Sequence, residues 1–356
     1  MKKSDKNTDT LTSGADKAAE KIDQLLKEID ELDKEEGKIV NALHLIEKAK
    51  AGDSVAQYNL GLCYAKGEGV KKDSAEAVKW FHKAAEQGLV QAQHNLGVFY
   101  QNGDGVAKDE AEAVKWYRKA AEQGADKAQN NLGMCYLNGN GVEKNLKEAV
   151  KWFHAAAEQG DALSQYNLAL RYANGEGVEK DSAEAVKWFH KAAEQGLPDT
   201  QYYLGMFYAD GDGVEKDCVL STEWIRKAAE QGHATAQSVL GTCYITGAGV
   251  AQDPKEAVKW WRAAAEQEVA DAQFFLGSCY FDGEGIEKNE TEAVKWWRKA
   301  ADQGHSQAQC NIGMCYLDGV GVAKEMDEAV KWLRAAAEQG NEDAKESLES
   351  IQGEQM

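Results

Sequence analysis

A fixed period of 36 residues organises most of this chain. From Ala56 to Gly340 one pattern returns eight times, without an insertion or a deletion. The first copy opens with Ala-Gln-Tyr-Asn-Leu-Gly-Leu-Cys-Tyr-Ala-Lys-Gly-Glu-Gly-Val over residues 56–70 and continues through Trp80 to Gly88. Such a period is typical of solenoids, in which each repeat packs only on its neighbours. We therefore predict one elongated stack of repeats, although 356 residues would suffice for two globular domains.

The charge balance narrows the classes of partner. The formal net charge is -19, from 60 acidic and 41 basic residues. Such a field repels phosphate backbones and anionic lipid headgroups, so we predict no nucleic-acid partner. No apolar run approaches the ~20 residues of a membrane-spanning helix, and membrane insertion is not expected. The start, residues 1–6, carries lysines without an apolar stretch behind them, so no secretory signal is predicted.

The seven cysteines favour a reducing compartment. Phe99 and Phe207 hold, in two repeats, the position that cysteine holds in five, which indicates an apolar packing site. Neighbouring copies are expected to lie beyond the ~7 Å Cα separation that a disulfide allows. Cys218 and Cys310 have no partner at metal-ligand spacing, so we predict free thiols and a cytoplasmic location. The five repeat cysteines are Cys63, Cys135, Cys243, Cys279 and Cys315.

The second half of each repeat predicts a helix, which we call helix B. Asp73 stands three residues before Glu76, a spacing that resembles a capping box and that recurs in five further repeats. The helix is expected to run for about 14 residues, to a left-handed glycine such as Gly88. The Trp80 position, occupied by tryptophan in all eight repeats, is predicted to lie in the core.

The first half predicts a second helix, helix A. Ala56, Leu60 and Tyr64 follow a helical spacing of four and mark its buried face. This helix is expected to end near Gly67. Gly61 lies in its middle, where glycine costs about 1 kcal/mol relative to alanine. We interpret Gly61 as the point where helix B crosses at close range.

These residues resemble a known family. Asn59-Leu60-Gly61, the Gly67-Glu68-Gly69-Val70 loop and the Trp80 to Gly88 stretch are similar to the Sel1-like repeat, a relative of the tetratricopeptide repeat. The 36-residue unit with its Gly-x-Gly-Val loop distinguishes it from the tetratricopeptide unit of about 34 residues. The resemblance implies an all-α fold, a right-handed superhelical α-solenoid of eight helix-turn-helix repeats, with helix A lining the concave side.

The repeats define the predicted domain limits. Residues 1–37 form a charged leader, 38–53 an N-terminal capping half-repeat, 54–340 the eight repeats, and 341–356 a C-terminal capping helix and tail. Residues 15–36 carry an apolar heptad spacing of fewer than three full heptads. They are predicted to form a solvated leader helix, or alternatively to support weak self-association or a partner helix. The heptad positions are Ala15, Ala18, Ile22, Leu25, Ile29 and Leu32.

No chemistry stands apart from the repeat pattern. The Gly-x-Gly loops have no preceding strand and no Gly-Lys-Ser/Thr, so they are not interpreted as phosphate loops. Asn140, Ala248 and Val320 replace the acidic loop residue of other repeats, and a turn at positive φ accounts for all eight loops without calcium. His82 and its histidine and arginine equivalents are interpreted as surface pairs with an acid four residues later. We predict no catalytic residues, no metal site and no cofactor.

Function is predicted to lie on helix A positions outside the core. The position before Leu60 is asparagine in five repeats, and an amide can both donate to and accept from the backbone of an extended peptide. Alternatively, this asparagine ladder serves the helix crossing. Repeats five to seven interrupt the ladder with an aromatic cluster that is expected to be exposed. The predicted partner-binding residues are Asn59, Asn95, Asn131, Asn167, Tyr202, Tyr203, Met206, Phe274, Phe275 and Asn311.

The sequence thus predicts a non-enzymatic scaffold or adaptor that binds a protein or an extended peptide on the concave helix A surface. The resemblance implies the same class of role. One alternative is a small-ligand-binding or hydrolase-like protein of the Sel1-like family. Another is a structural element that assembles through the N-terminal helix. The acidic balance favours a partner with basic segments.

Overall fold

A computed structural model describes residues 36–354 of the chain. Every regular element in that range is a helix, which confirms the all-α prediction. The heptad positions between Ala15 and Leu32 lie outside the described residues. The chain divides into two compact units, Met1–Asp161 and Ala162–Met356, and each is described by itself.

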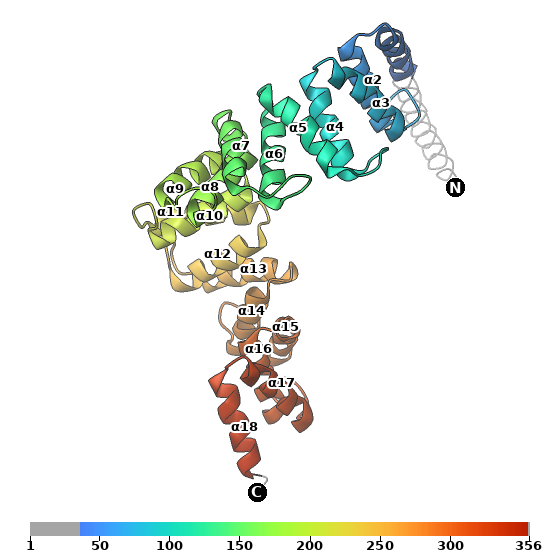
Figure 1. The fold of residues 1–356 in the computed structure, drawn as a ribbon. Helices are drawn as coiled ribbons and strands as arrows, with labels where there is room; N and C mark the ends of the chain where they lie inside the picture. Colours follow the sequence, from blue (N-terminus) through green and yellow to red (C-terminus); the bar gives the residue numbers. More distant parts are fainter. Residues whose placement is uncertain (1–35, 355–356) are drawn as a thin grey trace, which may run out of the picture. The chain divides into compact units, whose positions relative to one another are not determined.

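The first unit contains three repeats. A helix over residues 36–50 precedes them, and Ala49 of this helix packs in one cluster with Ala56 and Leu60 of the first repeat. Within this unit helices A and B alternate, and each repeat helix packs on the next (Figure 1). The helices are α2 (Ser54–Lys66), α3 (Ser74–Glu86), α4 (Val90–Asn102), α5 (Glu110–Glu122), α6 (Asp126–Asn138) and α7 (Leu146–Glu158).

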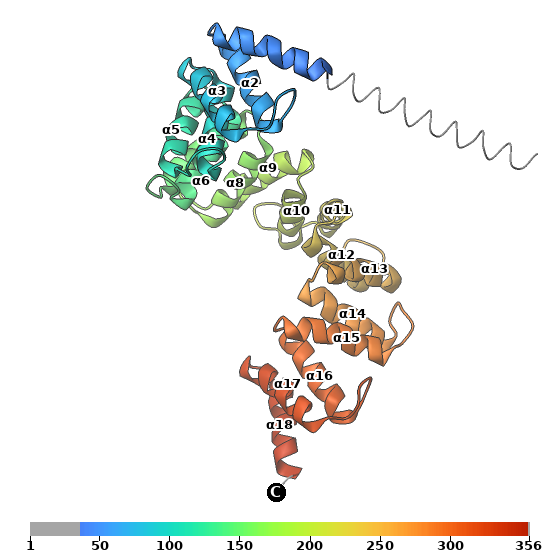
Figure 2. The ribbon, with the colours of Figure 1, turned by 90° about the vertical axis from the view of Figure 1, so that its right-hand side faces the viewer.

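The second unit contains five repeats and a final helix (Figure 2). Ala344 of that final helix, α18, is fully buried in a cluster with Leu333. The limits expected for the two caps, 38–53 and 341–356, stay predictions. The helices are α8 (Ala162–Asn174), α9 (Ser182–Glu194), α10 (Pro198–Asp210), α11 (Cys218–Glu230), α12 (Ala234–Thr246), α13 (Pro254–Glu266), α14 (Ala270–Asp282), α15 (Glu290–Asp302), α16 (Ser306–Asp318), α17 (Met326–Glu338) and α18 (Glu342–Glu354).

The predicted N-cap of helix B is present, but the capping box is only half formed. The Asp73 Oδ1 accepts hydrogen bonds from the Ala75 and Glu76 amides, both at 3.0 Å. The Asp73 amide donates to the carbonyl oxygen of Tyr64 at 2.9 Å, and not to the side chain of Glu76. Helix A therefore supplies the acceptor that a capping box would take from the third residue of helix B, and the Glu76 carboxylate pairs with Lys79 instead.

A left-handed glycine follows each of the two helices in seven of the eight repeats. Helix A ends at Gly67, whose φ is +80°, and helix B is followed by Gly88 at φ +89°. In repeat six Glu268 takes the Gly88 position at φ +66°, and it is the one described residue other than glycine with a positive φ. A left-handed conformation costs a non-glycine residue about 1 kcal/mol. The loop after α4 packs directly on α3, the preceding helix B. A Cβ on Gly105 of this loop would lie 2.2 Å from the Ser74 carbonyl carbon.

In five of the eight repeats, the centre is an aromatic ring of helix B lying on a glycine of helix A, whereas Ile225 and Leu333 take the place of the ring in repeats five and eight, and repeat four has Ala169 in place of the glycine. Phe81 is fully buried, and a Cβ on Gly61 would lie 2.7 Å from its ring carbon Cδ1. Tyr117 and Trp261 occupy the same position over Gly97 and Gly241. The mid-helix glycine is therefore the point where helix B crosses at close range, as expected, and the group that it admits is a large side chain of helix B.

The neighbouring Trp80 position serves a different contact. Trp116 packs in one cluster with Ala77, Phe81 and Leu96, so it covers the preceding repeat and not the centre of its own. Lys119 covers the outer side of this indole, with its Nζ 3.8 Å from the ring centroid. The expectation that all eight tryptophans are core residues is correct for three, whereas the other five are half-buried. The three buried ones are Trp116, Trp188 and Trp332.

Two glutamines per repeat, which sequence reasoning missed, join successive helices. The buried Gln93 on α4 donates through Nε2 to the Ala85 carbonyl oxygen at the end of α3, at 3.1 Å. Its Oε1 accepts from Gln123 Nε2 at the end of α5, at 2.7 Å. In the second unit Gln237 makes the same two bonds, at 3.1 and 2.8 Å. The signal was available, because all eight repeats carry glutamine at both positions.

Replacing Gln93 by leucine is expected to lower the free energy of unfolding by about 2 kcal/mol, because two buried hydrogen bonds of about 0.5–1.5 kcal/mol each are lost. Urea denaturation followed by circular dichroism measures the change. Gln91→Leu on the exposed side of the same helix is the matched control, with an expected change within about 0.5 kcal/mol. Equal changes in the two variants would show that the buried glutamine carries no structural role.

Candidate functional site

The ten predicted partner-binding residues all lie on helix A and are all half-buried. Ser238 and Cys310 hold the same repeat position as Tyr202 and Phe274. They are buried and therefore unavailable to a partner. In the first unit the ten include Asn59 on α2, Asn95 on α4 and Asn131 on α6. In the second unit they are Asn167 on α8, Tyr202, Tyr203 and Met206 on α10, Phe274 and Phe275 on α14, and Asn311 on α16.

In the first unit two of the asparagines contact His94, one from the same helix and one from the next helix A. The His94 Nε2 lies 3.2 Å from Asn131 Nδ2, and the His94 Nδ1 lies 3.3 Å from Asn95 Oδ1. The contact with Asn131 joins α4 to α6. Burial lowers the pKa of His94 below its ordinary value. The ladder therefore has a structural contact at this place, in addition to any role toward a partner.

In the second unit the aromatic residues of the ladder, Tyr203 and Phe275, stack on the buried ring of the preceding repeat. The Tyr203 ring lies 5.5 Å from that of Phe189, with an interplanar angle of 16°. The Phe275 ring lies 5.0 Å from that of Trp261, at 21°. Because one face of each ring is covered, the expectation of an exposed aromatic cluster is wrong. These rings are half-buried and held rigidly.

An aspartate-histidine pair supports the other two aromatic residues. Tyr202 stacks on His233 with ring centroids 5.0 Å apart, and His233 Nε2 lies 3.2 Å from Asp199 Oδ1. Phe274 stacks in the same way on His305, at 4.6 Å. Sequence reasoning missed this arrangement, although each histidine follows its aspartate by 34 residues.

The aspartate-histidine pairs are built for support and not for proton transfer. The His233 Nδ1 accepts the Ala236 amide at 3.0 Å and caps α12. Its Nε2 faces the Asp199 carboxylate. With both ring nitrogens occupied, the imidazole has no free position for a substrate proton.

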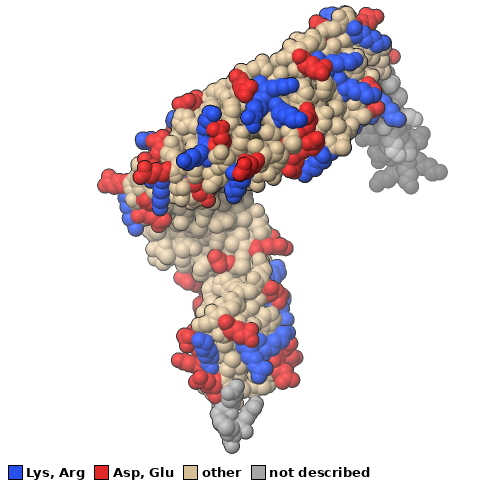
Figure 3. Space-filling view, viewed as in Figure 1, with Lys and Arg blue, Asp and Glu red and all other residues tan. Residues whose placement is uncertain are grey.

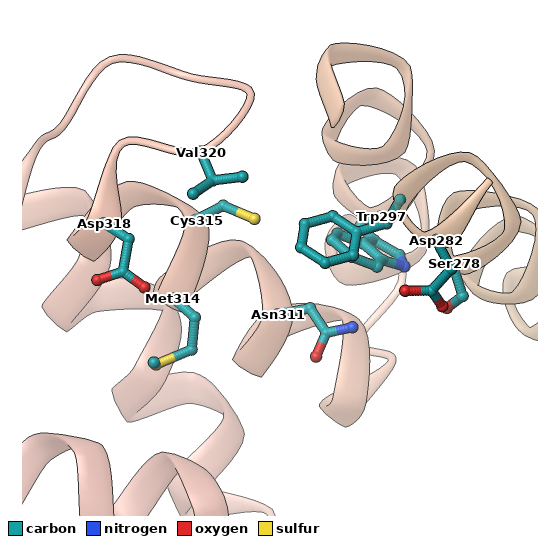
Figure 4. A pocket seen from close by; sticks show the side chains of 9 residues that line it. Ser278, Asp282, Trp297, Asn311, Met314, Cys315, Asp318 and Val320 are labelled. Atoms are coloured by element: carbon teal, nitrogen blue, oxygen red, sulfur yellow. The ribbon is translucent and has the colours of Figure 1, made fainter. Parts of the chain in front are cut away.

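A hollow of about 300 Å³ lies between α14 and α16 (Figure 4). Asn311 is the predicted site residue that lines it. Burial raises the pKa of the Cys315 thiol to about 11, and Asp318 adds to the shift, so this thiol stays protonated at neutral pH. Helix A of repeats seven and eight thus offers a small cavity in which the thiol of Cys315 is not ionised. It is lined by Ser278, Phe281, Asp282, Trp297, Asn311, Met314, Cys315, Asp318 and Val320.

Charged side chains gather on helix B. His82 lies 3.3 Å from Glu86, which confirms the predicted pairing for this histidine. The arginines at the same position differ, because Arg118 donates to the Tyr136 hydroxyl of the next repeat at 2.7 Å. Helix α12 carries no Lys, Arg, Asp or Glu, and the surface over α10 and α12 is largely free of charge in Figure 3.

Between residues 36 and 354 no helix is both long and apolar enough to cross a membrane. In the same range, no three His, Cys, Asp or Glu side chains gather in a way that could hold a metal ion.

The Sel1 repeat model matches the chain eight times, at residues 54–89, 90–124, 126–161, 162–197, 198–233, 234–269, 270–305 and 306–341. The chain belongs to the Sel1 repeat family. This Sel1 repeat protein is similar to a protective antigen present in uropathogenic Escherichia coli strains, which displays an SLR fold. The two are 41% identical over 87% of this chain and 67% of the antigen, with a TM-score of 0.84.

Two further relatives carry the same repeat. A Sel1 repeat protein from Oxalobacter formigenes is 34% identical, covers 87% of this chain and 90% of its own, and has a TM-score of 0.67. A Sel1-like repeat-containing protein of Acanthamoeba polyphaga mimivirus is 54% identical over 39 residues, which span 11% of this chain and 7% of the viral protein. Sel1 and related repeats generally mediate protein–protein interactions and are typically non-catalytic.

The buried His94 is expected to make stability depend on pH. The pKa of His94 in the folded state lies below its value of ~6.5 in the unfolded state. Above pH ~6.5 this histidine is neutral in both states and does not change the free energy of unfolding with pH. Below that pH the unfolded state binds a proton more readily than the folded state, so the stability falls as the pH drops. NMR titration of the imidazole should give a pKa below the ordinary value. Unfolding midpoints at pH 7.5 and 5.5 should differ less in His94→Asn, which copies Asn130 of the next repeat. His44→Asn, at an exposed position, controls for the loss of a histidine. The same pH dependence in wild type and His94→Asn would contradict this assignment.

Proposed function

We propose that this Sel1 repeat protein is a non-catalytic scaffold that binds an extended segment of a protein along the outer positions of helix A. The observation that carries the proposal is a contrast within each repeat. Buried positions such as Leu60 and Gln57 recur with little change, whereas the half-buried positions beside them change from repeat to repeat. A surface that varies on a constant scaffold is where a specific partner is recognised.

The side chains on this surface suit a peptide partner. Asparagine amides can satisfy both the N–H and the C=O of an extended backbone. Tyr203 and Phe275 are held by stacking, so little conformational entropy is lost when a partner covers them. The net charge of -19 argues against nucleic acid and anionic membranes as partners.

A cytoplasmic location is part of the proposal. All seven cysteines are free thiols. Free thiols persist where the compartment is reducing.

Affinity capture from cell extract tests the binding surface. A variant with Asn131→Ala, Tyr203→Val and Phe275→Val is expected to lose a specific partner that the wild type retains. Valine is used because Val239 fills the same position in repeat six, which keeps the fold intact. The matched control carries Lys115→Ala, Lys187→Ala and Lys259→Ala on exposed helix B positions. Recovery of every captured protein by the first variant, with an unchanged unfolding midpoint, would refute the proposed surface.

A second candidate is self-association through the N-terminal helix. Ile39, Val40 and Leu43 on the helix over residues 36–50 are 47, 66 and 58% exposed. Ile39 and Leu43 continue, in phase, the heptad spacing that the sequence shows between Ile22 and Leu32. A second copy of the chain offers the same stripe and could cover it as a paired helix.

Light scattering of the full chain tests this second candidate. The wild type is expected to show a concentration-dependent rise in mass toward a dimer, because pairing buries the exposed apolar stripe. The rise should disappear in Ile39→Glu with Leu43→Glu, and persist in the control Asn41→Glu on the same helix. A monomeric wild type over the whole concentration range would contradict self-association.

A further inference from the structure

The hollow between α14 and α16 has the size and lining of a site for one apolar side chain. Its volume of about 300 Å³ lies at the lower end of the ~300–1,000 Å³ range of ligand pockets. Phe281, Met314 and Val320 give it apolar walls. The buried Trp297 closes it from the side of helix B.

Two carboxylates flank the hollow. Asp282 is the last residue of α14, and Asp318 is the last residue of α16. Figure 4 shows them on opposite sides, with Trp297, Cys315 and Asn311 between them. Each lies at a helix C-terminus, where the helix dipole places partial negative charge. A bound cation is therefore attracted both by the carboxylate and by the helix end.

Neither carboxylate is neutralised within the described part of the chain. Asp282 and Asp318 are exposed and form no ion pair with a described Lys, Arg or His, unlike Glu292, which pairs with Lys295 at 2.6 Å. Lys288, whose Nζ lies 5.5 Å from the Phe281 ring centroid, is paired with Glu290 at 3.1 Å.

This arrangement is particular to repeats seven and eight. Repeats seven and eight are the one pair of neighbouring repeats in which helix A ends with an acidic residue both times. The six equivalents are Lys66, Asn102, Asn138, Asn174, Asp210 and Thr246. The charge pair is therefore a departure from the repeat and not a requirement of the fold.

Asn311 lies between the two carboxylates. Its Oδ1 accepts from Gln307 Nε2 at a long 3.4 Å, and its Nδ2 can donate outward. An amide at this place can hold the backbone of an extended segment. Alternate side chains of such a segment point the same way and repeat every ~6.6 Å, so a residue in the hollow can be flanked by two others that reach its sides.

We propose that the hollow binds an extended segment of the protein partner in which an apolar side chain stands between two arginines, in the order Arg-x-apolar-x-Arg. The apolar side chain fills the hollow, and the arginines contact Asp282 and Asp318. Arginine suits both carboxylates because its planar group donates two parallel hydrogen bonds. The proposal rests on the proposed function, since it specifies one sequence that the helix A surface recognises.

The probe is a synthetic nonapeptide, Gly-Ser-Arg-Gly-Leu-Gly-Arg-Ser-Gly, added to the full chain with ¹³C-labelled methionine methyl groups. The Met314 methyl resonance is expected to shift with peptide concentration, whereas Met134 on α6 and Met206 on α10 should not move. A peptide with both arginines replaced by citrulline, which is neutral and of the same shape, should bind at least tenfold more weakly. A Leu-to-Ser peptide should leave the Met314 resonance in place. Binding should weaken as salt is added.

Variants of the protein complete the test. Asp282→Asn with Asp318→Asn is expected to weaken peptide binding at least tenfold, and both positions are exposed, so the fold is kept. Asp210→Asn, at the end of α10, is the matched control and should bind as the wild type does. Equal binding of the citrulline peptide, or unchanged binding by the double variant, would overturn the proposal.

The outcomes separate this inference from the proposed function. If Met314 does not respond to the arginine peptide but the Asn131, Tyr203 and Phe275 variant still loses a captured partner, the inference fails and the scaffold function stands. If that variant retains every captured protein, the scaffold function fails, whatever the peptide does at Met314.

Discussion

The fold depends on the hydrogen-bonded glutamines that join one helix B to the next helix A and then to the following helix B. A helix end leaves carbonyl groups without partners, and the side chain of Gln93 gives the Ala85 carbonyl a second donor inside the stack. The same side chain accepts from Gln123, so one residue ties three helices together. Each link involves neighbours only. An array held by such links needs no long-range contact, which is why identical repeats suffice to build it.

Inside this frame the two faces of the repeat have different freedom. Phe81 on Gly61 fills the centre, and its position changes only among large side chains such as those of Tyr117 and Trp261. The outer positions of helix A have one covered face and one open face, so they can change singly. Tyr203 and Asn131 occupy equivalent positions with unlike chemistry and leave the packing below them intact. The half-buried state is thus a compromise between a rigid surface and a variable one.

The period and the caps made the helices predictable, because residues such as Asp73 and Gly67 begin or end a helix through contacts with their own neighbours in the sequence. The orientation of Trp80 was not predictable in the same way. Adjacent helix residues such as Trp80 and Phe81 point about 100° apart, and the pattern alone does not say which of the two faces the centre. The rings on which Tyr202 and Phe275 stack are brought to them by tertiary packing. The hollow beside Asp282 is lined by residues of two repeats. These contacts depend on how repeats stack, which a single repeat does not encode.

The loop glycine Gly105 lies against the Ser74 carbonyl, and this contact explains why the loop after helix A keeps one length. Surface loops usually absorb added residues, but this one fills a contact between repeats and has no room to grow. The opposite turn is different, because a side chain at Gly124 would meet no atom within 4 Å. We therefore expect insertions, fused domains or reporter tags to be tolerated in the turns after helix B. In the loops after helix A they are expected to disrupt the packing of one repeat on the next.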